Sequence, residues 1–365
     1  MIDYPRDDMS PLEQILIARI KTQGPITFAE YMTECLLHPD LGYYTTRDPF
    51  GRAGDFITAP EISQIFGEMI GLCLAQAWLD QGAPTPFALA ELGPGRGTLM
   101  ADILRVTAKV PGFHAAAHVH LVEAAPRMRE RQARTLAPRW PADRITWHDH
   151  ADDLPQQPLF LVANEFFDAL PIRQFQRHED GFFEMVLGEL MNQICIGLVP
   201  APADPRLTAR LDDTRPGDIV EICAAAPVIA RQIGQRIADH GGAALIIDYG
   251  DWRSLGSTLQ AMRDQSYAAV FDRPGEVDLT AHVDFEALLA DLPCAHTRLT
   301  PQGLFLERLG ITARAQALAE RMTGEALEQH VAAHRRLTHP QEMGTLFKVV
   351  GLYPAKSAPP PGLDA

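Results

Sequence analysis

One acid and three alternating glycines stand where a predicted strand meets a predicted helix. The segment FALAELGPGRGTLMADILR has an apolar run, then Glu91, then Gly93, Gly95 and Gly97, and then helical periodicity. Glycine permits a tight turn with positive φ and lets the backbone approach a ligand closely. In an open α/β sheet, ligands lie beyond the carboxyl ends of the strands. The turn therefore predicts a small-molecule site.

A second acid, Glu123, closes the next predicted strand in the segment AHVHLVEA. A carboxylate there can accept hydrogen bonds from two ribose hydroxyls. A dinucleotide fingerprint has the spacing G-x-G-x-x-G, whereas the glycines here follow G-x-G-x-G. An acid before such a turn and an acid closing the second strand form the pattern of class I S-adenosylmethionine methyltransferases. Dinucleotide binding and a purely structural turn are the alternatives.

A third predicted strand ends in the segment TWHDHADDLP. Asp149 falls where an acid commonly accepts a hydrogen bond from the adenine amino group in this fold, and His148 or Trp147 would flank the base. A solvated loop of acids is the alternative interpretation.

A fourth strand end carries Asn164, Glu165 and Asp168 in the segment VANEFFDALP. In a methyltransferase this edge of the sheet meets the methyl acceptor. Packing alone does not explain an amide and two carboxylates beside two phenylalanines after a buried strand. We therefore expect these three residues to act in binding or catalysis.

These residues depend on an α/β fold. Strand-like and helical segments alternate from about residue 87, which favours a parallel sheet with helices on both faces. A β-rich insertion with a turn at EDG interrupts the alternation at about 171–215. We expect a class I methyltransferase (Rossmann-like) doubly wound sheet in three segments: a helical N-terminal part with a cofactor flap over 1–85, the core over 86–353, and a disordered, Pro-rich tail over 354–365.

Composition and charge narrow the function. The 365 residues carry a formal net charge of −15, which disfavours nucleic acid because phosphate binding needs many Lys and Arg contacts. No window approaches about 18 uninterrupted apolar residues, so we expect no membrane span. The five cysteines are scattered, without a CxxC pair or a nearby His ligand set, which favours a reducing compartment and no metal site. The acidic N-terminal segment is neither a secretory signal nor a transit peptide, which favours a bacterial cytoplasm.

Four longer strings, GDFITAPEISQIFGE, ELGPGRGTLMADILR, ANEFFDALP and DLTAHVDF, resemble the signatures of the MidA-type methyltransferases. The resemblance runs from about residue 11 to about residue 351. It implies a class I core, S-adenosylmethionine as cofactor and a protein arginine as acceptor. The family includes the mitochondrial complex I assembly factor that methylates an arginine on a core subunit. Because no mitochondrial presequence is visible, the acceptor would be a bacterial complex I subunit or an equivalent protein.

The resemblance also implies that the GDF-T-PEIS string is a flap over the cofactor, with Asp55 or Glu61 near the sulfonium or the guanidinium. The alternative is that Pro60 and Glu61 merely begin a helix. Glu165 and Asp168 are the first candidates to pair with the guanidinium, because carboxylates bind it bidentately. His282 could help to remove a proton, although a lone histidine also suits a structural role.

Two other functions fit the same motifs. One is a methyltransferase for a small molecule or another protein side chain, and the other is an assembly protein that binds S-adenosylmethionine without turnover. Converging carboxylates favour the arginine enzyme over the first, and the intact glycine turn and Asn164–Glu165 pair argue against the second. The sequence gives no indication of the oligomeric state.

Overall fold

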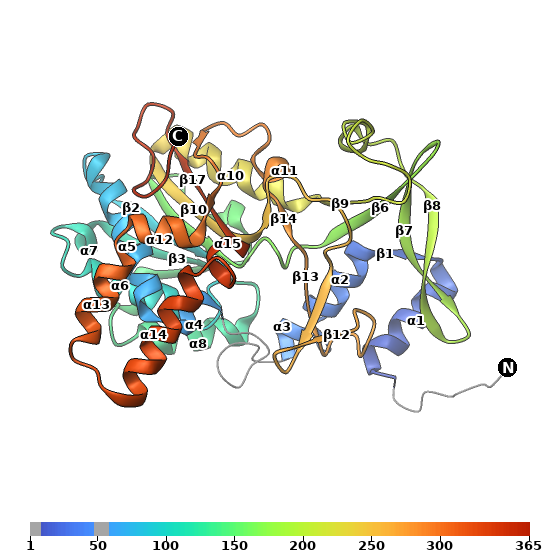
Figure 1. Cartoon of the computed structure of the whole chain (residues 1–365), viewed down its shortest axis with the longest axis horizontal. Helices are drawn as coiled ribbons and strands as arrows, with labels where there is room; N and C mark the ends of the chain where they lie inside the picture. The colour runs from blue at the N-terminus through green and yellow to red at the C-terminus, as the bar shows by residue number, and fades with distance from the viewer. Residues whose placement is uncertain (1–8, 47–57) are drawn as a thin grey trace. The chain divides into compact units, whose positions relative to one another are not determined.

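The computed structural model describes residues 9–46 and 58–365. Their backbone forms two compact units, whose elements are labelled in Figure 1. The core unit comprises residues 58–168, 226–252 and 283–365, and the first unit comprises residues 9–46, 169–225 and 253–282. Among the residues described, no helix is long and apolar enough to cross a membrane.

The core unit contains a nine-stranded sheet with the main order β15-β17-β10-β5-β2-β3-β4. Five of these strands run parallel and β17 is antiparallel to β10. The strands are β2 (Phe87–Leu92), β3 (Ala117–Val122), β4 (Ile145–His148), β5 (Leu159–Asn164), β10 (Gly242–Asp251), β14 (Val283–Asp284), β15 (Ala295–His296), β16 (Thr300–Pro301) and β17 (Phe347–Tyr353). The predicted doubly wound sheet is confirmed.

Helices connect and cover these strands. They are α4 (Ala59–Ile62), α5 (Gln64–Asp80), α6 (Thr98–Thr107), α7 (Phe113–Ala116), α8 (Pro126–Leu136), α10 (Ala225–His240), α11 (Phe285–Leu289), α12 (Gln302–Arg308), α13 (Ile311–Ala319), α14 (Gly324–Thr338) and α15 (Met343–Leu346). Every residue of β2 and β5 is buried, as expected for parallel strands covered on both faces. Helix α5 lies so close to α6 that a Cβ at Gly71 would stand 3.0 Å from the Cα of Ile103.

The first unit combines helices and antiparallel strands around its own core. Its elements are α1 (Pro11–Gln23), β1 (Ile26–Thr27), α2 (Phe28–Leu37), α3 (Tyr43–Thr46), β6 (Ile172–His178), β7 (Gly181–Leu190), β8 (Gln193–Pro200), α9 (Pro205–Thr208), β9 (Ile219–Cys223), β11 (Gln260–Arg263), β12 (Ser266–Ala268) and β13 (Asp278–Thr280). Tyr31 of α2, Leu187 of β7 and Leu279 of β13 belong to one buried cluster.

The division of the chain differs from the predicted boundaries. The β-rich insertion is present, and β6 and β7 pair across the predicted turn at Glu179 and Asp180. Residues 253–282, however, belong with the N-terminal helices because Ala261 and Leu279 pack in the same cluster as Tyr31. Helix α5 belongs to the core unit because its apolar residues pack with those of α6 and β2.

The predicted disordered tail is wrong. Leu363 is only 6% exposed and packs in the core cluster. Arg298 donates its backbone N–H to the carbonyl of Asp364 at 2.9 Å, and the Cys73 thiol lies 3.3 Å from the carbonyl oxygen of Pro361. One buried leucine and these backbone contacts fix a segment that lacks any periodic pattern.

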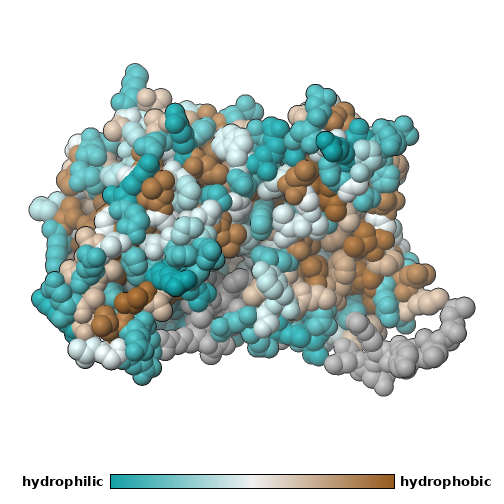
Figure 2. All heavy atoms as spheres, in the orientation of Figure 1, coloured by the Kyte–Doolittle hydropathy of each residue, from teal (hydrophilic) through white to brown (hydrophobic). Residues whose placement is uncertain are grey.

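The visible face of the molecule is largely hydrophilic, with apolar residues scattered among the polar ones (Figure 2). Several of the most exposed apolar side chains lie on the β7–β8 hairpin, namely Leu190, Met191, Ile196 and Leu198.

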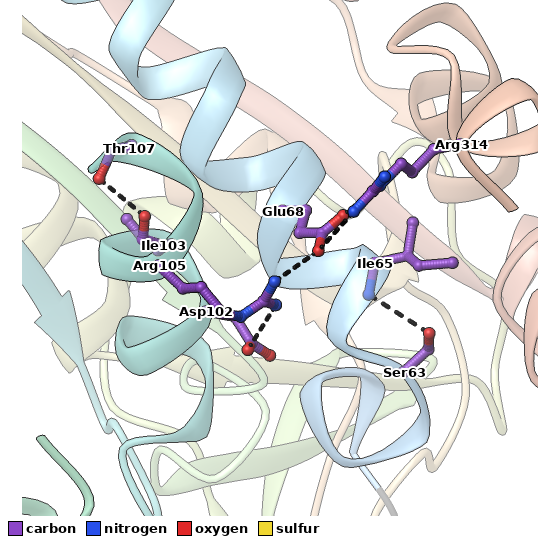
Figure 3. Close-up of polar contacts among 8 residues, drawn as sticks. All are labelled: Ser63, Ile65, Glu68, Asp102, Ile103, Arg105, Thr107 and Arg314. Carbon is purple, nitrogen blue, oxygen red and sulfur yellow. Dashed lines mark hydrogen bonds and ion pairs between the residues drawn. The ribbon is translucent and has the colours of Figure 1, made fainter. Parts of the chain in front are cut away.

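A buried charge network joins three helices of the core unit (Figure 3). The Glu68 carboxylate of α5 is 2% exposed and accepts hydrogen bonds from Arg105 of α6 at 2.6 Å and Arg314 of α13 at 2.7 Å. Asp102 also pairs with Arg105, at 2.9 Å. The arginines lower the pKa of Glu68 against the effect of burial, so the carboxylate stays charged. Every charge in the network has a partner, which identifies it as structural.

We expect Glu68→Gln to lower the free energy of unfolding by about 1–3 kcal/mol, because two guanidinium groups lose a charged acceptor. Chemical denaturation measures this change. The matched control is Glu328→Gln on α14, an exposed position where the change should stay within about 0.5 kcal/mol. Equal stability of the two variants would show that the network contributes nothing.

Candidate active site

The glycine turn between β2 and α6 has the predicted backbone. Gly93, Gly95 and Gly97 have φ of +60°, +50° and +79°, in the left-handed region that favours glycine. Gly93 donates its N–H to the carbonyl of Val122 at 3.0 Å, and a Cβ there would stand 2.9 Å from the ring of Phe166. The turn is therefore held against the end of β3 and the segment after β5.

Two acids and an amide at the strand ends lie on one face of the sheet. Glu91 pairs in register with Leu121 and Val162 of the neighbouring strands. Because side chains alternate along a strand, Glu123 and Asn164 point to the same face as Glu91, which is the face that α5 and α6 cover. Three predicted cofactor residues thus converge.

Glu91 and Asn164 each hold a buried oxygen that finds no hydrogen-bond partner among the residues described, Oε2 and Oδ1 respectively. Burial raises the pKa of Glu91 to about 8, opposed only by a backbone hydrogen bond from Met100. A buried acceptor without a partner is costly, and a ligand that donates a hydrogen bond would remove that cost. The pair fits a ligand that carries N–H donors or a positive charge.

Gln132 of α8 connects the glycine turn to the second acid, and no motif in the sequence predicts this role. Its amide nitrogen donates to the carbonyl of Gly95 at 2.9 Å and to Oε2 of Glu123 at 3.1 Å, while its oxygen accepts from the indole of Trp147 at 2.9 Å. Burial raises the pKa of Glu123 despite these donors. Gln132 is fully buried, so these contacts are shielded from water.

The ends of β3 and β4 are joined by Arg129. It donates to the carbonyl of Glu123 at 2.7 Å and pairs with Asp149 at 2.5 Å, so the predicted adenine acceptor is an exposed carboxylate held by an arginine. Of the two predicted flanking residues, Trp147 shares the face of Glu91 because it pairs with Leu121. His148 instead points to the opposite face, where it pairs with His120 at 2.9 Å.

Glu61 of α4 contacts the glycine turn, so the PEIS string does more than begin a helix. Its carboxylate accepts from the hydroxyl of Thr98, the first residue of α6, at 2.5 Å and lies 3.9 Å from Arg96. The predicted residue Asp55 lies outside the described residues.

The acceptor-side segment begins with Glu165, whose φ of +52° is unusual for a residue with a side chain. Its Oε1 accepts from the backbone N–H of Ala59 and from the amide of Asn164, both at 3.1 Å. Burial raises the pKa of Glu165. Within the described residues both hydrogen bonds end on Oε1, which leaves Oε2 for another partner.

The two remaining predicted residues, Asp168 and His282, belong to different units of the structure. Asp168 is buried and ends the same segment, with its N–H directed at Asp248 of β10 at 3.3 Å. His282 belongs to the first unit, where its N–H donates to the hydroxyl of Thr258 at 2.8 Å and Thr258 is held by Glu221. The role of His282 stays a prediction.

The described residues contain no group of three or more His, Cys, Asp or Glu side chains arranged to hold a metal ion.

Comparison with known proteins agrees with this geometry. A family model described as S-adenosyl-L-methionine-dependent methyltransferase matches residues 69–304. The human protein arginine methyltransferase NDUFAF7, mitochondrial, is 37% identical over 372 residues, covering 95% of this chain and 84% of that protein. This chain belongs to the S-adenosyl-L-methionine-dependent methyltransferase family.

Two further proteins resemble this chain over most of its length. The Drosophila melanogaster NDUFAF7 homolog is 36% identical and covers 94% of this chain and 85% of its own. A Burkholderia thailandensis crystal structure bound to S-adenosyl-homocysteine superposes with a TM-score of 0.83 at 28% identity, covering 95% of this chain and 92% of that one. The methyltransferase therefore uses S-adenosylmethionine, and the unpartnered oxygens of Glu91 and Asn164 fit a cationic cofactor.

We expect Gln132→Leu to weaken S-adenosyl-homocysteine binding about tenfold, because the glycine turn and Glu123 each lose a hydrogen bond worth about 1 kcal/mol. Isothermal titration calorimetry measures the affinity, and a far-ultraviolet spectrum checks the fold. Glu328→Gln again serves as the control. Unchanged affinity in a folded Gln132→Leu variant would mean that Gln132 does not position the cofactor site.

Proposed function

We propose that this methyltransferase transfers a methyl group to an arginine nitrogen of a protein. The observation that carries the proposal is the acceptor-side segment, where both hydrogen bonds to the Glu165 carboxylate from the residues described end on Oε1. A guanidinium group pairs readily with carboxylates. The relatives named protein arginine methyltransferase support the same acceptor.

In this proposal each cofactor residue serves a different part of S-adenosylmethionine. Glu91 and Asn164 receive the amino acid end of S-adenosylmethionine, the turn of Gly93, Gly95 and Gly97 allows its close approach, and Glu123 accepts from the ribose. Asp149 accepts from the adenine amino group, and Asp55 and Glu61 belong to the flap. When bound, the cofactor supplies an electrophilic methyl group on a sulfonium.

The acceptor residues orient the nucleophile. Glu165 and Asp168 draw the positive charge of the guanidinium towards themselves, so that one nitrogen is directed at the methyl group. Most of the rate then comes from positioning and exclusion of water, since the displacement needs no covalent intermediate.

The partner in this proposal is a respiratory complex I subunit or an equivalent protein, methylated in the cytoplasm of a bacterium. The family resemblance supports the partner. None of the five cysteines forms a disulfide in the described part of the chain, which supports a reducing compartment.

The test supplies methyl-labelled S-adenosylmethionine and an arginine-containing protein extract, and reads the modified residue by mass spectrometry. We expect label on arginine, with kcat/KM reduced about a hundredfold in Glu165→Gln because a charge that stabilises the transition state is lost. Glu328→Gln should retain full activity.

Three outcomes would contradict the proposal. Label on another side chain or on a small molecule would assign a different acceptor. Tight cofactor binding without any transfer would favour the non-catalytic assembly role. An unaffected Glu165→Gln variant would remove Glu165 from the reaction.

A further inference from the structure

A buried carboxylate on β10, Asp248, organises the acceptor-side segment although it lies 80 positions or more away in the sequence. The side chain is fully buried. Its Oδ2 accepts from the backbone N–H groups of Phe166 at 3.2 Å, Phe167 at 2.9 Å and Asp168 at 3.3 Å, and its Oδ1 accepts from Tyr249 at 3.0 Å. Four donors on one carboxylate stabilise its anion.

The same strand also holds the residue before this segment. Glu165 donates its N–H to the carbonyl of Ile247 at 2.9 Å. A non-glycine residue with φ of +52° persists only where the surroundings enforce it, and such strain clusters at active sites. Strand β10 enforces it here, through the Ile247 carbonyl before the segment and the Asp248 carboxylate along it.

Asp248 and Glu165 also interact through their charges. Burial raises the pKa of both, and the charge of Glu165 further raises that of Asp248. The other elements around Glu165 contribute little opposing charge: Arg336 of α14 acts only as a distant cation, and Glu61 of α4 is engaged with Thr98 and Arg96.

Asp248 has four backbone donors, whereas Glu165 has the Ala59 N–H and the Asn164 amide. Asp248 is fully buried, whereas Glu165 is partly exposed. Asp248 is therefore the carboxylate that fixes the backbone of the segment.

We propose that Asp248 is a positioning residue for methyl transfer, which fixes residues 166–168 and so holds the acceptor-side segment in place beside Glu165. This inference rests on the proposed arginine acceptor. In the fixed segment the Glu165 carboxylate can pair with a guanidinium, and a neutral acceptor gains no such ion pair.

The variant that tests the inference is Asp248→Asn, which keeps the size of the side chain but removes its charge. Glu68→Gln is the matched control, since it neutralises another buried carboxylate of the core unit outside the site. We expect Asp248→Asn to bind S-adenosyl-homocysteine within about threefold of the wild type and to lose at least tenfold in kcat/KM for an arginine peptide.

A second measurement reports on the segment directly. Amide hydrogen exchange should show protection at residues 166–168, which Asp248→Asn loses while α5 and α6 keep theirs.

An unchanged kcat/KM in Asp248→Asn, or an equal loss in Glu68→Gln, would overturn the role of Asp248. If the wild type methylates no arginine, the proposed function fails on its own. Amide exchange then still decides the positioning claim, because unchanged protection of residues 166–168 in Asp248→Asn would contradict it.

Discussion

A carboxylate buried at the carboxyl edge of a parallel sheet is unstable unless something supplies hydrogen bonds or positive charge. The core unit places Glu91, Glu165 and Asp248 in that situation, each at the end of a different strand. The local backbone conformation depends on which groups donate hydrogen bonds to each carboxylate. Asp248 takes its donors from the segment after β5 and so shapes it, whereas Oε2 of Glu91 finds no donor among the residues described.

Glu68 and Glu91 are both buried carboxylates, but only Glu68 pairs with arginines. Glu68 is as deeply buried as Glu91, but two arginines satisfy it and lower its pKa. Glu91 has no arginine, and burial raises its pKa to about 8. The stability of the fold alone does not explain a buried carboxylate at Glu91, because an apolar side chain there would avoid the free-energy cost of burying the charge. A cationic cofactor at Glu91 does give a reason.

Much of this organisation is local in sequence and was predictable. The alternation of segments predicts the sheet, and the spacing of Gly93, Gly95 and Gly97 predicts a turn with positive φ. Contacts between distant segments were not predictable: Gln132 lies in a helix with no special pattern, and Asp248 meets its donors only because β5 and β10 are neighbours in the sheet. The prediction of a disordered C-terminal tail was wrong for the same reason, because the packing of Leu363 orders the tail.

The central claim is that the orphaned carboxylate of Glu91 binds the cationic end of the cofactor. Calorimetric titration with S-adenosyl-homocysteine at pH 7, in two buffers of different ionisation enthalpy, tests it most directly. With a pKa of about 8 in the free protein, Glu91 is largely protonated at this pH, and pairing with the amino group should release up to about 0.9 proton per ligand. Glu91→Gln should bind at least tenfold more weakly and release none. Equal affinity in the two proteins, with no buffer dependence, would contradict the account.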